Sequence, residues 1–363
     1  MKRSGNKKIL ICCGGTGGHI MPAVAVADSI SEISASIEIR FAGRREGMEK
    51  NMVEKAGYEM DFIKSSSMNG RNLFKKFISL AVLTAGVFGA VRLLKNIRPT
   101  VVLATGGYVC FPVLAAAVIL RIPVYLQEQN SLPGLTTRLF AKRAKVVFSA
   151  WDSVQKLLKA KETLNYGNPV RKFNRPEEKK SAKSAEKTIV VFGGSQGASS
   201  INNAVDRGME LLKETGLNLI WQTGKRDYEK YKSKYDSLSG IEIYPFIDDI
   251  YSFYRKADIA VCRAGAIALS EIFLFGLPAV VVPYPYAADN HQAKNAEEAE
   301  KQGAVVVVSE ERNTGRVLIE KAIELSKDEE RLAYMHQKGL SLSRPDSAFK
   351  IGNEIIRREL GEA

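Results

Sequence analysis

Two glycine-rich segments are the residues of this sequence best suited to chemistry. Residues 14–19 read GGTGGH, and residues 193–197 read GGSQG. Glycine lets the backbone turn tightly and approach a ligand without a Cβ clash. A helix that begins directly after such a turn offers N–H groups and the positive end of its dipole to a phosphate or pyrophosphate. One such loop could be a structural turn, but two at matching places indicate phosphate binding.

His19 lies where the first glycine segment meets the helix expected after it. Its side chain could cap or brace the turn. The neutral imidazole could equally accept a proton from a substrate hydroxyl near neutral pH. The position of the residue favours neither interpretation.

Two further polar segments follow apolar runs, and a third precedes the expected linker. In residues 262–271 (CRAGAIALSE), Glu271 falls about one turn into a helix, where it could accept from two ribose hydroxyls or complement the helix dipole. Residues 283–292 end in DNHQ, which suits sugar hydroxyls but also an ordinary polar surface loop. Arg171, in GNPVR, could reach a diphosphate or be a solvated linker charge.

Residues 105–108 (TGGY) and 127–130 (QEQN) also follow apolar strands. In open parallel sheets, ligands bind outside the carboxyl ends of the strands. Both segments should therefore border the same site as the first glycine loop.

Both glycine segments belong to a repeated order of strand, glycine turn and helix, which opens a Rossmann-type unit. Further short apolar strands alternate with helical patterns, which indicates parallel, doubly wound sheets. The strands are predicted at Lys8–Cys13, 38–42, 101–104, 124–126, 146–148, Thr188–Phe192, Asn218–Gln222, 242–245, 258–262, Ala279–Val282 and 304–308.

The predicted fold is α/β, with two Rossmann-like doubly wound domains separated by a cleft. The N-terminal domain would span residues 1–170 and the C-terminal domain residues 188–340. Residues 171–187 lack an apolar period and would form the linker. A helix within 341–363 could pack back on the N-terminal domain.

The net charge of +13 favours anionic partners. No nucleic-acid recognition motif is visible, so nucleic acid is not an expected partner. The four cysteines form no CxxC pair and fit a reduced, cytosolic protein. The three histidines lack metal-ligand spacing, and no metal or cofactor is predicted.

Residues 77–91 form an uncharged stretch with basic residues on both sides. This stretch could be a buried domain helix. It could instead be an apolar patch with a basic rim that rests on an anionic membrane surface.

Taken together, these segments resemble the peripheral membrane N-acetylglucosaminyltransferases of peptidoglycan synthesis, which convert lipid I to lipid II. The resemblance extends from about residue 8 to the C-terminus. It rests on an ordered set of motifs: GGTGGH (14–19), GGY (106–108), EQN (128–130), GNPVR (167–171), GGSQG (193–197), FIDD (246–249), CRAGA (262–266), SE (270–271) and DNHQ (289–292).

The resemblance implies a GT-B glycosyltransferase. GlcNAc would pass from UDP-GlcNAc to the 4-hydroxyl of MurNAc-pentapeptide on undecaprenyl diphosphate, with inversion and without a metal. It also implies a peripheral location on the cytoplasmic face of the cell membrane, on an anionic surface, with other cell-wall synthesis proteins as further partners.

The resemblance also implies roles for particular residues. The backbone at Ile247 would meet the uracil, Glu271 the ribose, and Ser195 and Arg171 the diphosphate, while Gln292 and Asn130 would contact GlcNAc. The remaining donor contacts implied are Thr16, Gly17, Gly18, Ala266, Ile267, Ala268, Leu269 and Ser270. The acceptor diphosphate would face Gly14, Gly15, Gly106, Gly107 and Tyr108.

The family commonly has threonine where this chain has Ala268, which removes a hydroxyl contact to the donor diphosphate. Helix N-termini and Arg171 would stabilise the leaving UDP. His19 is the favoured general base, with Glu128 second.

Three alternatives remain. The first is another UDP-sugar enzyme of the same architecture, such as a glycolipid synthase or UDP-GlcNAc epimerase. The second is a nicotinamide-dependent dehydrogenase, which the missing GxGxxG motif disfavours. The third is a non-catalytic UDP-sugar-binding or nucleic-acid-binding protein.

Overall fold

The computed structural model describes residues 7–63, 73–172, 186–194, 196–311 and 316–361, with side chains in the helix that begins at Leu73 described from residue 83 onward. The chain divides into two compact units. Unit 1 comprises Met1–Phe173 and Arg344–Ala363, and unit 2 comprises Asn174–Ser343.

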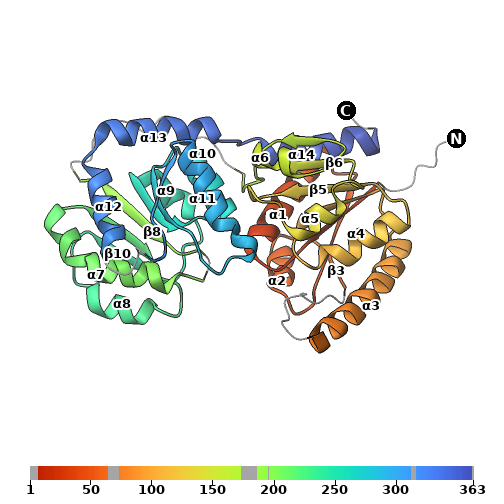
Figure 1. Cartoon of the computed structure of the whole chain (residues 1–363), viewed down its shortest axis with the longest axis horizontal. Coiled ribbons are helices and arrows are strands. Elements are labelled where there is room, and N and C mark those ends of the chain that lie inside the picture. Colours follow the sequence, from red (N-terminus) through yellow and green to blue (C-terminus); the bar gives the residue numbers. More distant parts are fainter. Residues whose placement is uncertain (1–6, 64–72, 173–185, 195, 312–315, 362–363) are drawn as a thin grey trace. The chain divides into compact units, whose positions relative to one another are not determined.

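Unit 1 is built on a seven-stranded parallel sheet (Figure 1). Its strands, in spatial order, are β3 (Met60–Phe62), β2 (Glu38–Gly43), β1 (Lys8–Cys13), β4 (Val101–Gly106), β5 (Val124–Glu128), β6 (Val146–Ser149) and β7 (Thr163–Asn165). Its helices are α1 (Gly17–Ile33), α2 (Met48–Lys55), α3 (Leu73–Ile97), α4 (Cys110–Ile119), α5 (Leu135–Phe140), α6 (Ser153–Leu157) and α14 (Ser347–Ile355), which continues as a π-helical turn, Ile356–Leu360.

Both faces of this sheet are buried, because alternate residues of each strand point to opposite sides. On β1, Ile9, Ile11 and Cys13 join one apolar cluster with residues of α1 and α14. Leu10 and Cys12 join a second cluster with residues of α3 and α4. A strand buried on both faces reads as a continuous apolar run, which explains why the sequence pattern predicts it so well.

Unit 2 is built on a six-stranded parallel sheet. Its strands, in spatial order, are β10 (Ile241–Tyr244), β9 (Asn218–Gln222), β8 (Thr188–Phe192), β11 (Ile259–Arg263), β12 (Ala279–Val282) and β13 (Val305–Val307). Its helices are α7 (Ser199–Thr215), α8 (Tyr228–Tyr235), α9 (Ile250–Lys256), α10 (Ala266–Leu274), α11 (His291–Lys301), α12 (Val317–Ser326) and α13 (Glu329–Leu342), with a short 3₁₀ turn at Ala288–Asn290.

Two parallel, doubly wound α/β sheets confirm the predicted fold class, and each predicted strand lies within two residues of its observed bounds. The pattern missed β3 and β7, the two edge strands of unit 1. Each has three residues, all only half-buried, so neither produces a long apolar run. The predicted cleft remains a prediction, and most of the linker 171–187 lies outside the described residues.

The apolar stretch 77–91 lies within α3. No helix in the described ranges is both long and apolar enough to cross a membrane.

Candidate active site

Each glycine loop lies at the point in its sheet where the strand order reverses. In unit 1 the loop after β1 lies beside the loop after β4, and in unit 2 the loop after β8 lies beside the loop after β11. In open sheets, helices leave such neighbouring strands on opposite sides, and ligands bind between the two loops. The topology thus places both predicted phosphate loops where open α/β sheets bind ligands.

The first loop is packed against the end of β4 so closely that only glycine fits. A Cβ on Gly107 would lie 2.1 Å from the carbonyl oxygen of Gly14, and a Cβ on Gly106 would lie 2.6 Å from Nδ1 of His19. Both glycines have positive φ, at 115° and 89° for Gly106 and Gly107. The structure therefore brings together two predicted motifs, GGTGGH and GGY.

Helix α1 begins at Gly17, directly after the loop, and its N-cap Thr16 makes no side-chain capping hydrogen bond. The first N–H groups of a helix have no acceptor within it. Gly15 and Thr16 are exposed, while Gly17 and Gly18 are half-buried. The start of α1 can therefore accept an oxyanion, as the sequence predicts for this loop.

The imidazole of His19 is half-buried and held by residues from two other strand ends. Its Nδ1 lies 2.9 Å from Oε1 of Gln129, and its carbonyl oxygen accepts a hydrogen bond of 2.8 Å from Thr105 Oγ1. These residues lie 86 and 110 positions away in the sequence. His19 is thus a positioned imidazole at the mouth of the glycine loop.

Glu128 is buried and its carboxylate accepts four hydrogen bonds from its own unit. The donors to Oε1 are the backbone N–H and side-chain amide of Asn130, at 3.1 and 3.3 Å. Those to Oε2 are the Gly134 N–H and the Thr137 hydroxyl, at 3.0 and 2.6 Å. This geometry makes Glu128 a brace for the loop 130–137 and orients Asn130.

Tyr108 contacts a cation that the sequence analysis did not select. Arg44, just beyond the end of β2, donates a hydrogen bond from Nη1 to the Tyr108 hydroxyl, and its guanidinium carbon lies 5.6 Å from the ring centroid. Its backbone N–H donates to the buried carboxylate of Glu49, at 3.1 Å. The pair Arg44-Arg45 after a predicted strand end is the signal that could have found it.

In unit 2, Gln222 links the second glycine loop to the FIDD segment. Its Nε2 donates to the carbonyl oxygen of Gly194 at 2.9 Å, and its Oε1 accepts from the Ile247 N–H at 3.0 Å. Both Gln222 and Ile247 are buried. Gly197 packs tightly here as well, since a Cβ would lie 2.1 Å from the Thr223 carbonyl oxygen. Ser195 lies outside the described residues.

Helix α10 begins after β11 with Gly265 as an N-cap that makes no side-chain hydrogen bond. Leu269 donates its N–H to the Gly265 carbonyl at 2.9 Å, so the N–H groups of Ala266, Ile267 and Ala268 precede the first intrahelical bond. Ser270 donates its hydroxyl to the Ala266 carbonyl, at 2.9 Å. The backbone at the start of α10 is thus arranged for an anion.

Glu271, one turn further along α10, is half-buried and accepts a hydrogen bond of 3.5 Å from the Tyr251 hydroxyl. Tyr251 belongs to α9, which follows the FIDD segment. This contact places the predicted ribose carboxylate beside the predicted uracil segment.

The loop after β12 is held by Gln292 and Arg263. Gln292 Oε1 accepts from the Tyr284 N–H at 2.9 Å. Arg263 donates from Nη1 to the Val282 carbonyl at 3.1 Å and to Glu310 Oε2 at 2.6 Å. The sequence analysis did not select Arg263, whose role is evident only from these contacts. Arg171 is exposed near the end of unit 1.

Three cysteines beside these loops are poorly suited to act as nucleophiles. Cys12 and Cys13 are fully buried at the end of β1, and burial raises the pKa of each thiol well above its ordinary value. Burial likewise raises the pKa of Cys262 to about 12. All three thiols are therefore protonated near neutral pH.

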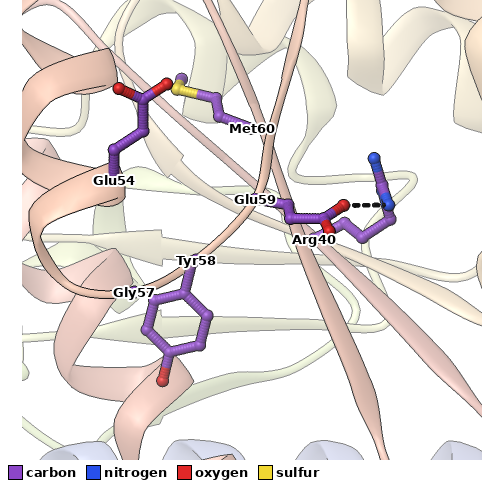
Figure 2. Close-up of a pocket in the computed structure, with 6 residues that line it drawn as sticks. All are labelled: Arg40, Glu54, Gly57, Tyr58, Glu59 and Met60. Atoms are coloured by element: carbon purple, nitrogen blue, oxygen red, sulfur yellow. Dashed lines mark hydrogen bonds and ion pairs between the residues drawn. The ribbon is translucent and has the colours of Figure 1, made fainter.

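A hollow elsewhere on unit 1 is lined by Arg40, Glu54, Gly57, Tyr58, Glu59 and Met60 (Figure 2). Arg40 is paired there with Glu59 and Asp61, at 2.6 and 2.9 Å. The hollow adjoins the turn that enters β3 at the amino end of that strand, whereas the glycine loop follows the carboxyl end of β1. It contributes no residue to the candidate site.

Two Rossmann-type sheets in tandem, each with a glycine loop at its switch point, form the GT-B architecture of glycosyltransferases. Residues 9–149 match the glycosyltransferase family 28 N-terminal domain, and residues 188–349 match the glycosyltransferase family 28 C-terminal domain. The chain belongs to glycosyltransferase family 28.

Similar proteins match over nearly the whole chain. A protein of Geotalea uraniireducens is 37% identical over 359 residues, which cover 97% of this chain and 98% of that protein. One of Caldanaerobacter subterraneus is 37% identical over 358 residues, covering 95% and 98%. Both are named UDP-N-acetylglucosamine--N-acetylmuramyl-(pentapeptide) pyrophosphoryl-undecaprenol N-acetylglucosamine transferase. The crystal structure of Acinetobacter baumannii MurG matches with a TM-score of 0.81 and 28% identity, over 97% of this chain and 99% of that one.

Proposed function

We propose that this chain transfers GlcNAc from UDP-GlcNAc to lipid I and so forms lipid II. The chain is a UDP-GlcNAc-dependent glycosyltransferase of family 28. The observation that carries the proposal is the match to transferases of that name over almost their full length. The glycine loop at each switch point supports the proposal, because open α/β sheets bind ligands at such points.

The decisive experiment is transfer of radiolabelled GlcNAc from UDP-GlcNAc to a soluble lipid I analogue, with UDP-GalNAc as the comparison donor. We expect a labelled disaccharide product from UDP-GlcNAc. Release of UDP without product, or formation of an epimerised nucleotide sugar, would favour one of the alternative UDP-sugar enzymes.

For the chemical step, the acceptor 4-hydroxyl attacks the anomeric carbon of GlcNAc while the bond from that carbon to the diphosphate oxygen breaks. The hydroxyl proton passes to His19, and the electron pair of the broken bond leaves with UDP. Attack from the face opposite the leaving group inverts the anomeric centre and gives a β(1→4) link. The assignment to His19 is supported by its place at the mouth of the first glycine loop, with Nδ1 2.9 Å from Gln129 Oε1.

Glu128 is the less suitable base, because its two oxygens already accept four hydrogen bonds. Its role in our proposal is to orient Asn130 toward the GlcNAc hydroxyls. Gly14, Gly15, Gly106, Gly107 and Tyr108 would face the acceptor diphosphate, and Arg44 adds a positive charge at Tyr108.

The uracil and ribose of the donor would bind to unit 2. The Ile247 N–H already donates to Gln222, so its carbonyl is the backbone group that would accept from the uracil ring. The start of α10 and Arg171 would stabilise the diphosphate as negative charge develops on it. In this chain Ala268 supplies a backbone N–H only, without the hydroxyl common at that position in the family.

The ribose assignment has its own test. Glu271→Ala should weaken UDP binding about 10- to 100-fold, since hydrogen bonds to charged groups are worth about 1.5–3 kcal/mol. Calorimetric titration with UDP measures this directly. An unchanged Kd would exclude Glu271 from the ribose contact.

The membrane surface would be a face of unit 1 where α3, α4 and α5 adjoin. Phe88, Ile119, Leu135 and Leu139 are exposed there, at 73%, 63%, 53% and 54%. Basic residues in these helices and in the turns that follow them are exposed as well, namely Arg92, Lys95, Arg98, Arg121, Arg138, Lys142 and Arg143. Apolar side chains within a basic rim suit an anionic bilayer surface, which we assign to the cytoplasmic face.

Flotation with phosphatidylglycerol vesicles tests this surface. We expect Phe88→Ser/Ile119→Ser to remain in the soluble fraction while retaining transfer to a soluble acceptor analogue. Vesicle binding equal to that of the wild type would refute the assignment.

A further inference from the structure

Gln129, the middle residue of the EQN motif, is buried. Both the nitrogen and the oxygen of its side-chain amide take part in hydrogen bonds. Nε2 donates to the Thr105 carbonyl oxygen at 2.5 Å and also to Oε1 of Gln127. Oε1 lies 2.9 Å from Nδ1 of His19.

The orientation of this amide follows from its neighbours. The groups around Nε2 are oxygen acceptors, so exchanging the nitrogen and oxygen would place the amide oxygen against the Thr105 carbonyl. Gln127 is itself oriented, because its Nε2 donates to Asn168 Oδ1 at 3.1 Å, and Asn168 donates to the Gln129 carbonyl at 3.2 Å. The oxygen of Gln129 therefore faces His19.

An amide oxygen only accepts hydrogen bonds, so Nδ1 of His19 must carry the proton. In the neutral imidazole the lone pair then lies on Nε2. Gly106 fixes the ring position, because its missing Cβ leaves the space that Nδ1 occupies. The Thr105 hydroxyl donates a hydrogen bond to the backbone carbonyl of His19.

We infer that Gln129 is a positioning residue that keeps the proton of neutral His19 on Nδ1, so that Nε2 accepts the proton of the substrate hydroxyl. The catalytic part rests on the proposed function. The tautomer itself does not, and it can be measured without substrate.

The first test is the ring-nitrogen NMR spectrum of the [15N]histidine-labelled chain, at a pH where the imidazoles are neutral. Only three histidines are present, and His291→Gln and His336→Gln identify two of them. Both of these also face backbone carbonyl oxygens through Nδ1, at 2.6 and 2.7 Å, and serve as internal references.

In the wild type we expect the His19 proton on Nδ1. In Gln129→Met it should move toward Nε2, with the other two rings unchanged. Thr137→Val is the matched control, since it removes a buried hydrogen bond at the same strand end without touching His19. A wild-type proton on Nε2, or a tautomer unaltered in Gln129→Met, would overturn the inference.

The second test is kinetic. Gln129→Met should lower kcat about 10- to 100-fold, the range found when the hydrogen-bond partner of a metal-bound histidine is removed. KM for UDP-GlcNAc should stay near the wild-type value. Gln129→Glu keeps an oxygen at Nδ1 and should recover part of kcat, which a loss of packing alone would not predict. Wild-type kcat in Gln129→Met would refute the positioning role, whereas absence of transfer by the wild type would refute the proposed function.

Discussion

The two glycine loops occupy equivalent places in the two sheets, yet the side chains around them differ in chemical type. The first loop is surrounded by titratable groups: His19, Tyr108, Arg44 and the buried Glu49. The described residues of the second loop are neutral, and it is braced by Gln222 and by close backbone contacts with Thr223. In our proposal, the first loop takes part in proton transfer and the second holds a ligand through neutral donors.

A buried amide serves both loops, but with different partners. Gln129 connects the first loop to an imidazole, whereas Gln222 connects the second loop to the backbone of Ile247. Since an amide cannot itself titrate, its effect depends on what it holds. Substitution of Gln129 should therefore alter kcat, and substitution of Gln222 should alter donor affinity.

The largest effect should come from His19. His19→Ala should lower kcat by about 10²–10⁴-fold, the usual contribution of a positioned general base. UDP affinity, measured by calorimetry, should remain within about twofold because the proposed uracil and ribose contacts, at Ile247 and Glu271, are unchanged. His336→Ala is the control histidine variant. Near-normal kcat in His19→Ala would remove the proton-transfer role from the first loop.

Arg44 provides the next test of the comparison. Arg44→Ala should raise KM for a soluble lipid I analogue by about 10- to 100-fold, since a hydrogen bond to a charged group contributes about 1.5–3 kcal/mol. Arg45→Ala is the matched control, because that guanidinium lies 5.0 Å over the Phe62 ring. Equal effects of the two substitutions on KM would indicate general charge attraction, and would contradict a specific contact at Tyr108.

Much of the fold is readable from the sequence because both sheets are parallel and buried on both faces. β1 and β8 appear as unbroken apolar runs followed by glycines. β3 and β7 are not readable, since three half-buried residues at a sheet edge carry no period.

Site residues can be predicted from the sequence only where the residue type itself suggests a chemical role. His19 and Glu271 stand out as titratable groups beside helix starts. Gln129 and Gln222 do not, because a neutral amide at a strand end gains its meaning from partners far away in the chain. Gln129 meets His19 across 110 residues, and Gln222 meets Ile247 across 25.

Gln222 tests the binding side of the comparison. Gln222→Met removes hydrogen bonds to Gly194 and Ile247, each worth about 0.5–1.5 kcal/mol, so UDP should bind roughly 10-fold more weakly. kcat at saturating donor should change little. Thr223→Val is the control, because its hydroxyl contacts Gly224 and Tyr244 instead. A loss of kcat with unchanged UDP affinity would reverse the assignment of roles.

The smallest expected effect comes from the ion pair between Arg263 and Glu310, which holds the loop after β12. Burial alone would raise the pKa of Glu310, but hydrogen bonds from Arg263 and Ser200 outweigh burial and hold it below its ordinary value. A carboxyl with a lowered folded-state pKa contributes stability above its unfolded pKa of about 4.3, and this contribution is lost as pH falls through the folded value.

Glu310→Gln should therefore lower the Tm at pH 7, by about 2–4 °C for each kcal/mol lost from a domain of this size. The difference from the wild type should shrink as pH falls below about 4, where the wild-type carboxyl becomes protonated as well. Glu311→Gln, at the exposed neighbouring position, should show no such pH dependence. Thermal melts of the three proteins from pH 3 to pH 8 measure this. A constant Tm difference across the range would mean that the charge of Glu310 does not stabilise unit 2.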